Sequence, residues 1–154
     1  MAAMRVHLGT DHAGYELKEA LAQHLNQEGY EVVDHGAFVY DAQDDYPAFC
    51  FAAAEAVRDE PGSLGVVIGG SGNGEQLAAN CVNGVRAILA WNPEIAKLGR
   101  QHNNANVISV GGRMHSQEEA FAIVDAFLET PFSEDERHKR RVQQMTTYRA
   151  VNGS

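Results

Sequence analysis

The feature that most constrains this fold is a regular alternation of short apolar segments with amphipathic ones. Between the apolar segments lies helical periodicity, seen most clearly where Leu17, Leu21 and Leu25 recur every four residues. Strands joined by helical crossovers produce this order. The sequence therefore predicts one doubly wound α/β domain over residues 1–154, with helices on both faces of a five-stranded, mostly parallel sheet. The predicted strands lie at 4–9, 31–34, 64–68, 85–90 and 106–110.

Helix starts are marked by capping signals. Pro47 suits the first turn of a helix, and Asn92, Pro93 and Glu94 combine a cap, a proline and an acid. Capping boxes at 116–119 and 133–136 open two more helices, the last an extra C-terminal helix over about 134–146. The helix after Pro47 is expected to bury one stripe, formed by Phe49, Ala52, Ala53, Ala56 and Val57.

Strand order does not follow from the sequence directly. If the order is 2-1-3-4-5, the topological switch point lies between the first and third strands. Ligands in such sheets bind outside the carboxyl ends of the strands near that point. The turns after Gly9 and Ile68 are therefore the expected positions of a site.

Composition excludes several functions. The net charge of −9 disfavours a broad contact with nucleic acid or an acidic membrane, so an anionic ligand would need a local basic cluster. No apolar run is long enough to cross a bilayer, and the N-terminus leads straight into the first predicted strand. We expect a cytoplasmic protein with Cys50 and Cys81 as buried, reduced thiols.

The turn after the first strand places an acid beside an imidazole. Asp11 and His12 follow Gly9 and Thr10, at the expected carboxyl end of the strand. They could act as an acid–base pair on a ligand. The structural alternative is that Asp11 caps the next helix and His12 is an ordinary polar residue.

The turn after the third strand is rich in glycine. Gly69-Gly70-Ser71-Gly72-Asn73-Gly74-Glu75 can bring several backbone amides close to a phosphate or an enediolate oxygen at a helix N-terminus. Glu75 is either a general base or an acid that complements the helix dipole. A lysine-containing phosphate loop is excluded because Glu75 stands where lysine would be, and the dinucleotide spacing is absent.

Further candidates lie towards the C-terminus. His102 and Asn103 either cap a helix or act on a sugar ring, and Arg113 follows the fifth strand. Arg137 and Arg141 are four residues apart, so two guanidinium groups on one helix face could grip a phosphate. The alternative is a solvated helix with acids first and bases last. The seven histidines show no zinc-type spacing.

Taken in order, these motifs resemble ribose-5-phosphate isomerases of type B, whose family also includes galactose-6-phosphate isomerase subunits. The motifs are Gly9-Thr10-Asp11-His12-Ala13-Gly14, Asp45-Tyr46-Pro47, Gly70-Ser71-Gly72-Asn73-Gly74, Ala78-Ala79-Asn80, His102-Asn103, Gly111-Gly112-Arg113 and the basic C-terminal helix. The resemblance extends from Met4 to about Tyr148. It implies a Rossmann-like fold and a homodimer with shared sites, the C-terminal helix packing on or reaching the partner.

The resemblance also implies an activity: metal-independent, cofactor-free interconversion of D-ribose 5-phosphate and D-ribulose 5-phosphate through a cis-enediolate, a step of the pentose phosphate pathway. Many members use a cysteine where this chain has Gly69, and a branch of the family uses a glutamate that Glu75 matches. The alternatives are an isomerase of a six-carbon sugar phosphate, such as allose or galactose 6-phosphate, and a non-catalytic sugar-phosphate-binding module.

The same resemblance assigns roles to residues of this chain. The catalytic set would be Glu75 as the base, Ser71 in the anion hole, and Asp11 with His102 for opening the sugar ring. The substrate-binding set would be His12, Gly70, Gly72, Asn73, Gly74, Asn103, Arg113, Arg137 and Arg141.

Overall fold

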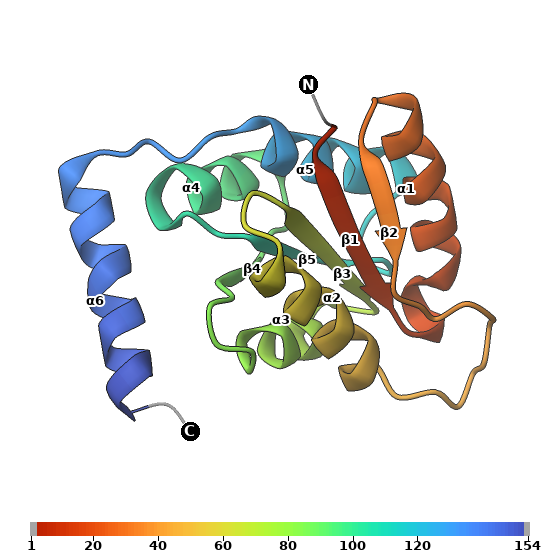
Figure 1. Cartoon of the computed structure of the whole chain (residues 1–154). Helices are drawn as coiled ribbons and strands as arrows, with labels where there is room; N and C mark the ends of the chain where they lie inside the picture. Colours follow the sequence, from red (N-terminus) through yellow and green to blue (C-terminus); the bar gives the residue numbers. More distant parts are fainter. Residues whose placement is uncertain (1–2, 153–154) are drawn as a thin grey trace.

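The computed structural model describes residues 3–152; the ends of the predicted domain, 1–2 and 153–154, lie outside the described residues. The chain alternates strands and helices as predicted (Figure 1). Its elements are β1 (Arg5–Thr10), a 3₁₀ turn η1 (His12–Gly14), α1 (Tyr15–Gln27), β2 (Glu31–Asp34), α2 (Pro47–Asp59), β3 (Leu64–Gly69), α3 (Asn73–Asn80), β4 (Ala87–Leu89), α4 (Pro93–Asn103), β5 (Val107–Gly111), α5 (Gln117–Glu129) and α6 (Glu136–Asn152).

The five strands form one sheet in the order β2-β1-β3-β5-β4, and every neighbouring pair is parallel. The 2-1-3-4-5 order was wrong for the last two strands. β5 is buried along its whole length and lies inside the sheet, whereas β4 has only 3 residues and forms the edge. The switch point between β1 and β3 is nevertheless where it was expected.

An apolar core lies on each face of the sheet. Side chains of α1, α4 and α5 pack on one face, and those of α2 and α3 pack on the other. β3 serves both cores because Val66 and Ile68 point to the first face and Val67 to the second. In Figure 1, α2 and α3 lie in front of the sheet, α1 and α5 lie behind it, and α6 stands apart from both layers.

Most predicted helix signals are confirmed. Leu21 and Leu25 are buried on α1, Pro47 opens α2, and the Asn92 side chain caps α4 by accepting from the Ile95 amide at 2.9 Å. Ser116 forms both bonds of its capping box. The stripe predicted for α2 was partly wrong: the buried positions are Cys50, Ala53, Ala54 and Val57, so the face is rotated slightly from the predicted one.

The second capping box was also wrong. Glu134 has a left-handed backbone, with φ of 58°, so helical geometry starts only after it. Asp135 accepts from the Arg137 amide at 3.0 Å, while the Ser133 hydroxyl pairs with His138 Nδ1 at 2.8 Å. The C-terminal helix consequently runs from 136 to 152 rather than over about 134–146.

The two cysteines differ in burial. Cys50 is fully buried in the second core, where burial first, and then the nearby charges of Glu75 and Asp11, strongly raise the pKa of its thiol. Cys81 is exposed, contrary to expectation. It directly follows α3, whose inward face is formed by Ala78 and Ala79, so Cys81 falls on the outward side.

A buried lysine anchors the segment that follows β2. Lys18 on α1 has no exposed surface, and its ammonium donates to Asp34 at 2.7 Å and to the Ala37 carbonyl at 2.6 Å. Ala37 also donates its amide to the Thr10 carbonyl at 2.7 Å. Because a buried ammonium must be paired, these bonds fix the start of the loop over residues 35–46 beside the end of β1.

Within residues 3–152, no helix combines the length and the apolar character that crossing a membrane would require.

Candidate active site

The turns after β1, β3 and β5 meet at one edge of the sheet. In the strand register, Thr10 lies beside Ile68, and Gly69 lies beside Gly111. The Thr10 hydroxyl donates to the Ile68 carbonyl at 2.6 Å, and the Gly112 amide donates to the Gly69 carbonyl at 2.7 Å. These bonds join the three turns into one unit at the switch point, where α/β sheets bind ligands.

Asp11 is a helix cap, as the structural alternative proposed, and it also faces this site. One of its oxygens accepts from the Ala13 amide at 3.0 Å, and the carboxylate is buried. The other oxygen lies 3.8 Å from Nδ1 of His12. Capping therefore leaves one carboxylate oxygen available beside an imidazole.

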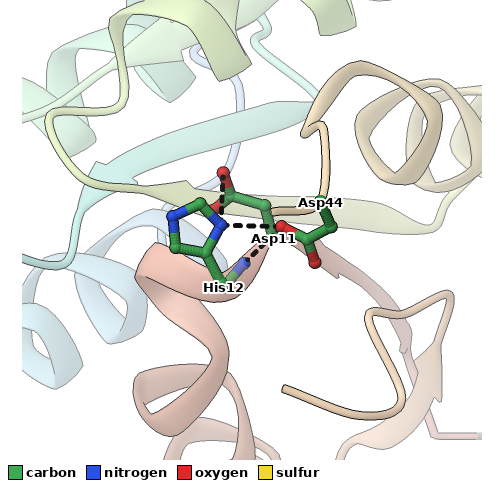
Figure 2. A group of neighbouring side chains, drawn as sticks. All are labelled: Asp11, His12 and Asp44. Atoms are coloured by element: carbon green, nitrogen blue, oxygen red, sulfur yellow. Dashed lines mark hydrogen bonds and ion pairs between the residues drawn. The ribbon is translucent and has the colours of Figure 1, made fainter. Parts of the chain in front are cut away.

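His12 is paired with an acid that the sequence analysis missed. Figure 2 shows Asp44, from the loop after β2, with its Oδ1 beside both His12 Nδ1 and the His12 backbone amide, at 2.7 and 3.0 Å. No motif marks Asp44, because it lies among several acids of an irregular loop. Donor atoms of Asp11, His12 and Asp44 all lie within 4.8 Å of one another, so this group could also hold a cation.

Glu75 occupies the first turn of α3 with only 5 % of its surface exposed. Burial raises the pKa of its carboxyl group and the charge of Asp11 adds to the rise, while the Glu75 amide opposes it. The carboxyl group lies against the Cα of Gly69, so a Cβ added there would fall on it. Glu75 thus fills the space that any side chain at position 69 would need.

The glycine-rich turn is held rigidly. Gly72 has a left-handed φ of 88°, and its carbonyl accepts from the buried Ser109 hydroxyl at 2.7 Å. The Ser71 hydroxyl accepts from the amide and side-chain nitrogens of Asn73, each at 3.2 Å. The ring of Tyr46 lies against Gly74, so the motif containing Tyr46 closes one side of this turn.

Arg113 lies over the other side of the turn. Its amide donates to the Gly70 carbonyl at 3.1 Å, and a Cβ added at Gly70 would be 3.4 Å from its guanidinium Nη1. One chain therefore brings together nine of the predicted residues at this edge: Asp11, His12, Gly70, Ser71, Gly72, Asn73, Gly74, Glu75 and Arg113.

The other four predicted residues lie elsewhere in the same chain. α4 leaves the carboxyl end of β4 and returns to the amino end of β5, so His102 and Asn103 lie near the opposite edge of the sheet. His102 is exposed and its ring packs on His138 at 4.4 Å between centroids; burial first, and then His102, lower the pKa of His138. Arg137 and Arg141 are exposed on α6.

Asn103 lines a cavity of about 450 Å³ between the β4 region and α6, together with Met145 and Arg149. The Arg149 guanidinium reaches across this cavity to the Asn80 carbonyl and to Asn83 Oδ1. The cavity is thus bounded on one side by α6, and the structure of one chain does not bring the four remaining predicted residues to Glu75.

Comparison with known proteins places this arrangement in a family. The chain belongs to the ribose/galactose isomerase family, whose model matches residues 6–145. It is 59 % identical over 148 residues to ribose-5-phosphate isomerase B of Mycobacterium tuberculosis strain H37Rv, covering 96 % of this chain and 91 % of that one. The Escherichia coli K12 protein of the same name is 38 % identical over 142 residues, covering 92 % and 94 %.

Solved structures agree with this assignment. The crystal structure of ribose-5-phosphate isomerase B from Mycoplasma genitalium with bound ribulose-5-phosphate superposes with a TM-score of 0.93 at 38 % identity, covering 97 % of this chain and 99 % of that one. The resemblance proposed from the sequence motifs is thus confirmed, as is the α/β fold with its additional C-terminal helix.

Proposed function

We propose that the protein interconverts D-ribose 5-phosphate and D-ribulose 5-phosphate through a cis-enediolate, without a metal or another cofactor. The observation that carries this proposal is the Glu75 carboxyl group, buried against Gly69 beside the amides of the glycine-rich turn. Within an isomerase family this places a general base next to preformed donors. The names of the relatives, and the ribulose-5-phosphate in the Mycoplasma genitalium structure, support a five-carbon substrate.

In the isomerisation, Glu75 takes the proton from C2 and returns it to C1. A carboxylate with a raised pKa is a better proton acceptor near neutral pH than an exposed glutamate. Its position against Gly69 restricts the carboxyl group to one side of the turn. The same group can serve both carbons because they are adjacent in the open-chain sugar.

The turn before α3 stabilises the enediolate oxygen. The amides of Gly70, Gly72 and Gly74, with the Ser71 hydroxyl, line this turn at a helix N-terminus. Each preformed donor contributes about 3 kcal/mol to transition-state stabilisation, judged by the removal of comparable donors elsewhere. The bonds that fix Gly72 and Ser71 keep these donors in place before the substrate arrives.

The remaining steps require groups from both edges of the sheet. Asp11 and His102 open the furanose ring, and Asn103 positions the sugar. The phosphate is bound by His12 and Arg113 together with Arg137 and Arg141, which supply binding energy away from the reacting carbons. Because one chain separates these groups, we propose a homodimer in which His102, Asn103 and α6 complete the site of the partner.

Exposed apolar side chains on α6 support this dimer. Met145, Tyr148 and Val151 recur every three residues, and Tyr148 and Val151 are 70 % and 76 % exposed. Leu77, on α3 close to the glycine-rich turn, is 70 % exposed as well. Large apolar residues at helical spacing that stay exposed within the described residues 3–152 are typical of a surface that a second copy buries.

The proposal also includes a cytoplasmic location and no nucleic-acid or membrane partner. The net charge of −9 disfavours both kinds of partner. Cys50 and Cys81 are both free thiols, which suits a reducing compartment.

The deciding experiment is proton NMR of ribose 5-phosphate in D₂O with purified protein, with and without EDTA. Ketose formation with deuterium at the exchanged carbon, unchanged by EDTA, supports the enediolate mechanism. Loss of activity in EDTA that added metal restores would instead indicate a metal-dependent mechanism at the Asp11, His12 and Asp44 group. Turnover of only six-carbon sugar phosphates would favour a six-carbon sugar-phosphate isomerase. Binding without turnover would favour a non-catalytic sugar-phosphate-binding module.

A further inference from the structure

The loop after β2 supplies a side chain that fixes His12 from two directions. Oδ1 of Asp44 accepts from the His12 backbone amide at 3.0 Å and pairs with ring Nδ1 at 2.7 Å. The first bond fixes the chain at His12, and the second fixes the rotation of the ring. Figure 2 shows the other ring nitrogen, Nε2, on the far side of the ring from Asp44.

This pairing determines which ring nitrogen remains available. A carboxylate oxygen only accepts, so Nδ1 must carry the proton in the Asp44 pair. Nε2 is then left to interact with a ligand, in the same way that second partners select the tautomer of other functional histidines. Asp11 Oδ2, at 3.8 Å from Nδ1, lies on the same side and adds negative charge there.

The cost of this arrangement indicates that it has a role beyond loop packing. Oδ2 of Asp44 is buried and has no hydrogen-bond partner among residues 3–152. A buried carboxylate oxygen without a partner destabilises the fold, and a neutral residue here would avoid that cost. Among residues 3–152, the His12 ring is the only side chain that hydrogen-bonds Oδ1 of Asp44.

Asp44 is presented by an anchored segment. Lys18 holds the loop at the Ala37 carbonyl, and the Tyr15 hydroxyl donates to the Phe38 carbonyl at 3.3 Å. Closer to the site, the Asp44 amide donates to the Asp41 carbonyl at 3.1 Å. The rings of Tyr40 and His12 are perpendicular, with 6.3 Å between their centroids. The loop therefore delivers the carboxylate to His12 in a defined position.

We propose that Asp44 is a positioning residue that holds the His12 ring with Nδ1–H on its carboxylate and Nε2 directed to the phosphate of the substrate. The inference rests on the proposed function, which places His12 at the phosphate. Asp44 does not touch the substrate in this scheme and acts through His12 alone.

Steady-state kinetics of four variants test the proposal: Asp44→Ala, Asp44→Asn, His12→Ala and the double variant Asp44→Ala/His12→Ala. Asp44→Ala is expected to raise KM for ribose 5-phosphate about tenfold with a smaller change in kcat, the loss expected when one charged hydrogen bond is removed. Asp44→Asn retains an acceptor oxygen, so most of the affinity should return. The double variant should be no worse than His12→Ala.

Asp41→Ala is the matched control, because Asp41 is an acid of the same loop whose side chain, within the part of the chain that the structure describes, accepts only from the nearby Gln43 amide, at 2.9 Å. It should leave KM unchanged. ¹⁵N spectra of the His12 ring add a readout independent of turnover: the proton should reside on Nδ1 in the unmodified protein and lose that preference in Asp44→Ala.

The outcomes separate the two proposals. Normal kinetics for His12→Ala would remove His12 from the phosphate site and overturn both the assignment and this inference. Impaired His12→Ala with normal Asp44→Ala would overturn the role of Asp44 alone. The role would be overturned equally if Asp44→Ala still raised KM in the His12→Ala background, or if Asp41→Ala impaired binding to the same extent.

Discussion

The two edges of the sheet differ in how far one chain completes them. At the carboxyl edge, the turns after β1, β3 and β5 are tied together by hydrogen bonds and enclose the Glu75 carboxyl group. At the other side, α6 buries His138 alone among its residues and leaves Arg137 and Arg141 exposed, together with the apolar side chains of Met145, Tyr148 and Val151.

This difference matches a division of the proposed reaction between proton transfer at the carboxyl edge and phosphate binding by α6. The proton transfer and the enediolate need groups fixed within tenths of an ångström, and one chain builds them rigidly. Phosphate binding tolerates longer, charged side chains, and these lie on a helix that its own chain leaves largely uncovered. If this division is right, the groups for proton transfer are complete in one chain, and the groups for phosphate binding are supplied by a partner.

The largest effect is expected at Glu75. Glu75→Gln removes the base while keeping the shape, so kcat should fall about a thousandfold with KM nearly unchanged. Steady-state kinetics on ribose 5-phosphate measures this change. Glu94→Gln is the matched control, because Glu94 occupies the first turn of α4 and is exposed. Near-normal kcat for Glu75→Gln would exclude Glu75 as the base.

Gly69→Ala tests whether the carboxyl edge tolerates any displacement of that base. The added Cβ would fall on the Glu75 carboxyl group, so kcat should drop about a hundredfold and overpacking should cost about 1–3 kcal/mol of stability. Kinetics and thermal unfolding measure the two effects. In Gly69→Ala/Glu75→Ala the clash is gone and the stability should return; a persistent loss would place the strain elsewhere.

A mixing experiment tests whether the partner chain supplies the phosphate-binding arginines. Arg137→Ala/Arg141→Ala should raise KM strongly, and on its own should be nearly inactive at low substrate. After refolding with an equal amount of Glu75→Gln, half of the dimers are mixed and each has one intact site, so about a quarter of normal activity should appear. Activity equal to the sum of the two separate variants would show that each site is built within one chain.

The sequence predicted which residues gather at the carboxyl edge better than how the rest of the chain packs around them. Periodicity and caps located the strands and most helices, because each depends on neighbouring residues in the chain. The placement of Glu75 in a first helical turn was predicted for the same reason, since it follows the glycine-rich turn. The β5–β4 order and the position of His102 depend on how distant segments pack, and no local pattern records that.

Asp44 shows the same limit within the site itself. Its pairing with His12 joins residues 32 positions apart through an irregular loop, so no spacing rule identifies it. The buried Lys18 that anchors the loop was equally unexpected, because lysine at a helical position ordinarily indicates solvent.

The smallest effect compares two glutamates in first helical turns. Burial raises the pKa of Glu75, whereas hydrogen bonds from Ser116 lower the pKa of Glu119 in its capping box. ¹³C NMR titration of the carboxyl carbons should place them on opposite sides of 4.5, the ordinary value. The acid limb of kcat should then lie above 4.5, since the base must be ionised.

The folded state holds the Glu75 proton more tightly than the unfolded chain, so Glu75 favours folding at low pH and loses that contribution as pH rises through its raised pKa. Glu75→Gln should therefore be more stable than the unmodified protein at neutral pH, with the gap closing below pH 4.5. Equal titration of the two glutamates would mean that the carboxyl edge is open to water and that its apparent enclosure does not prepare a base.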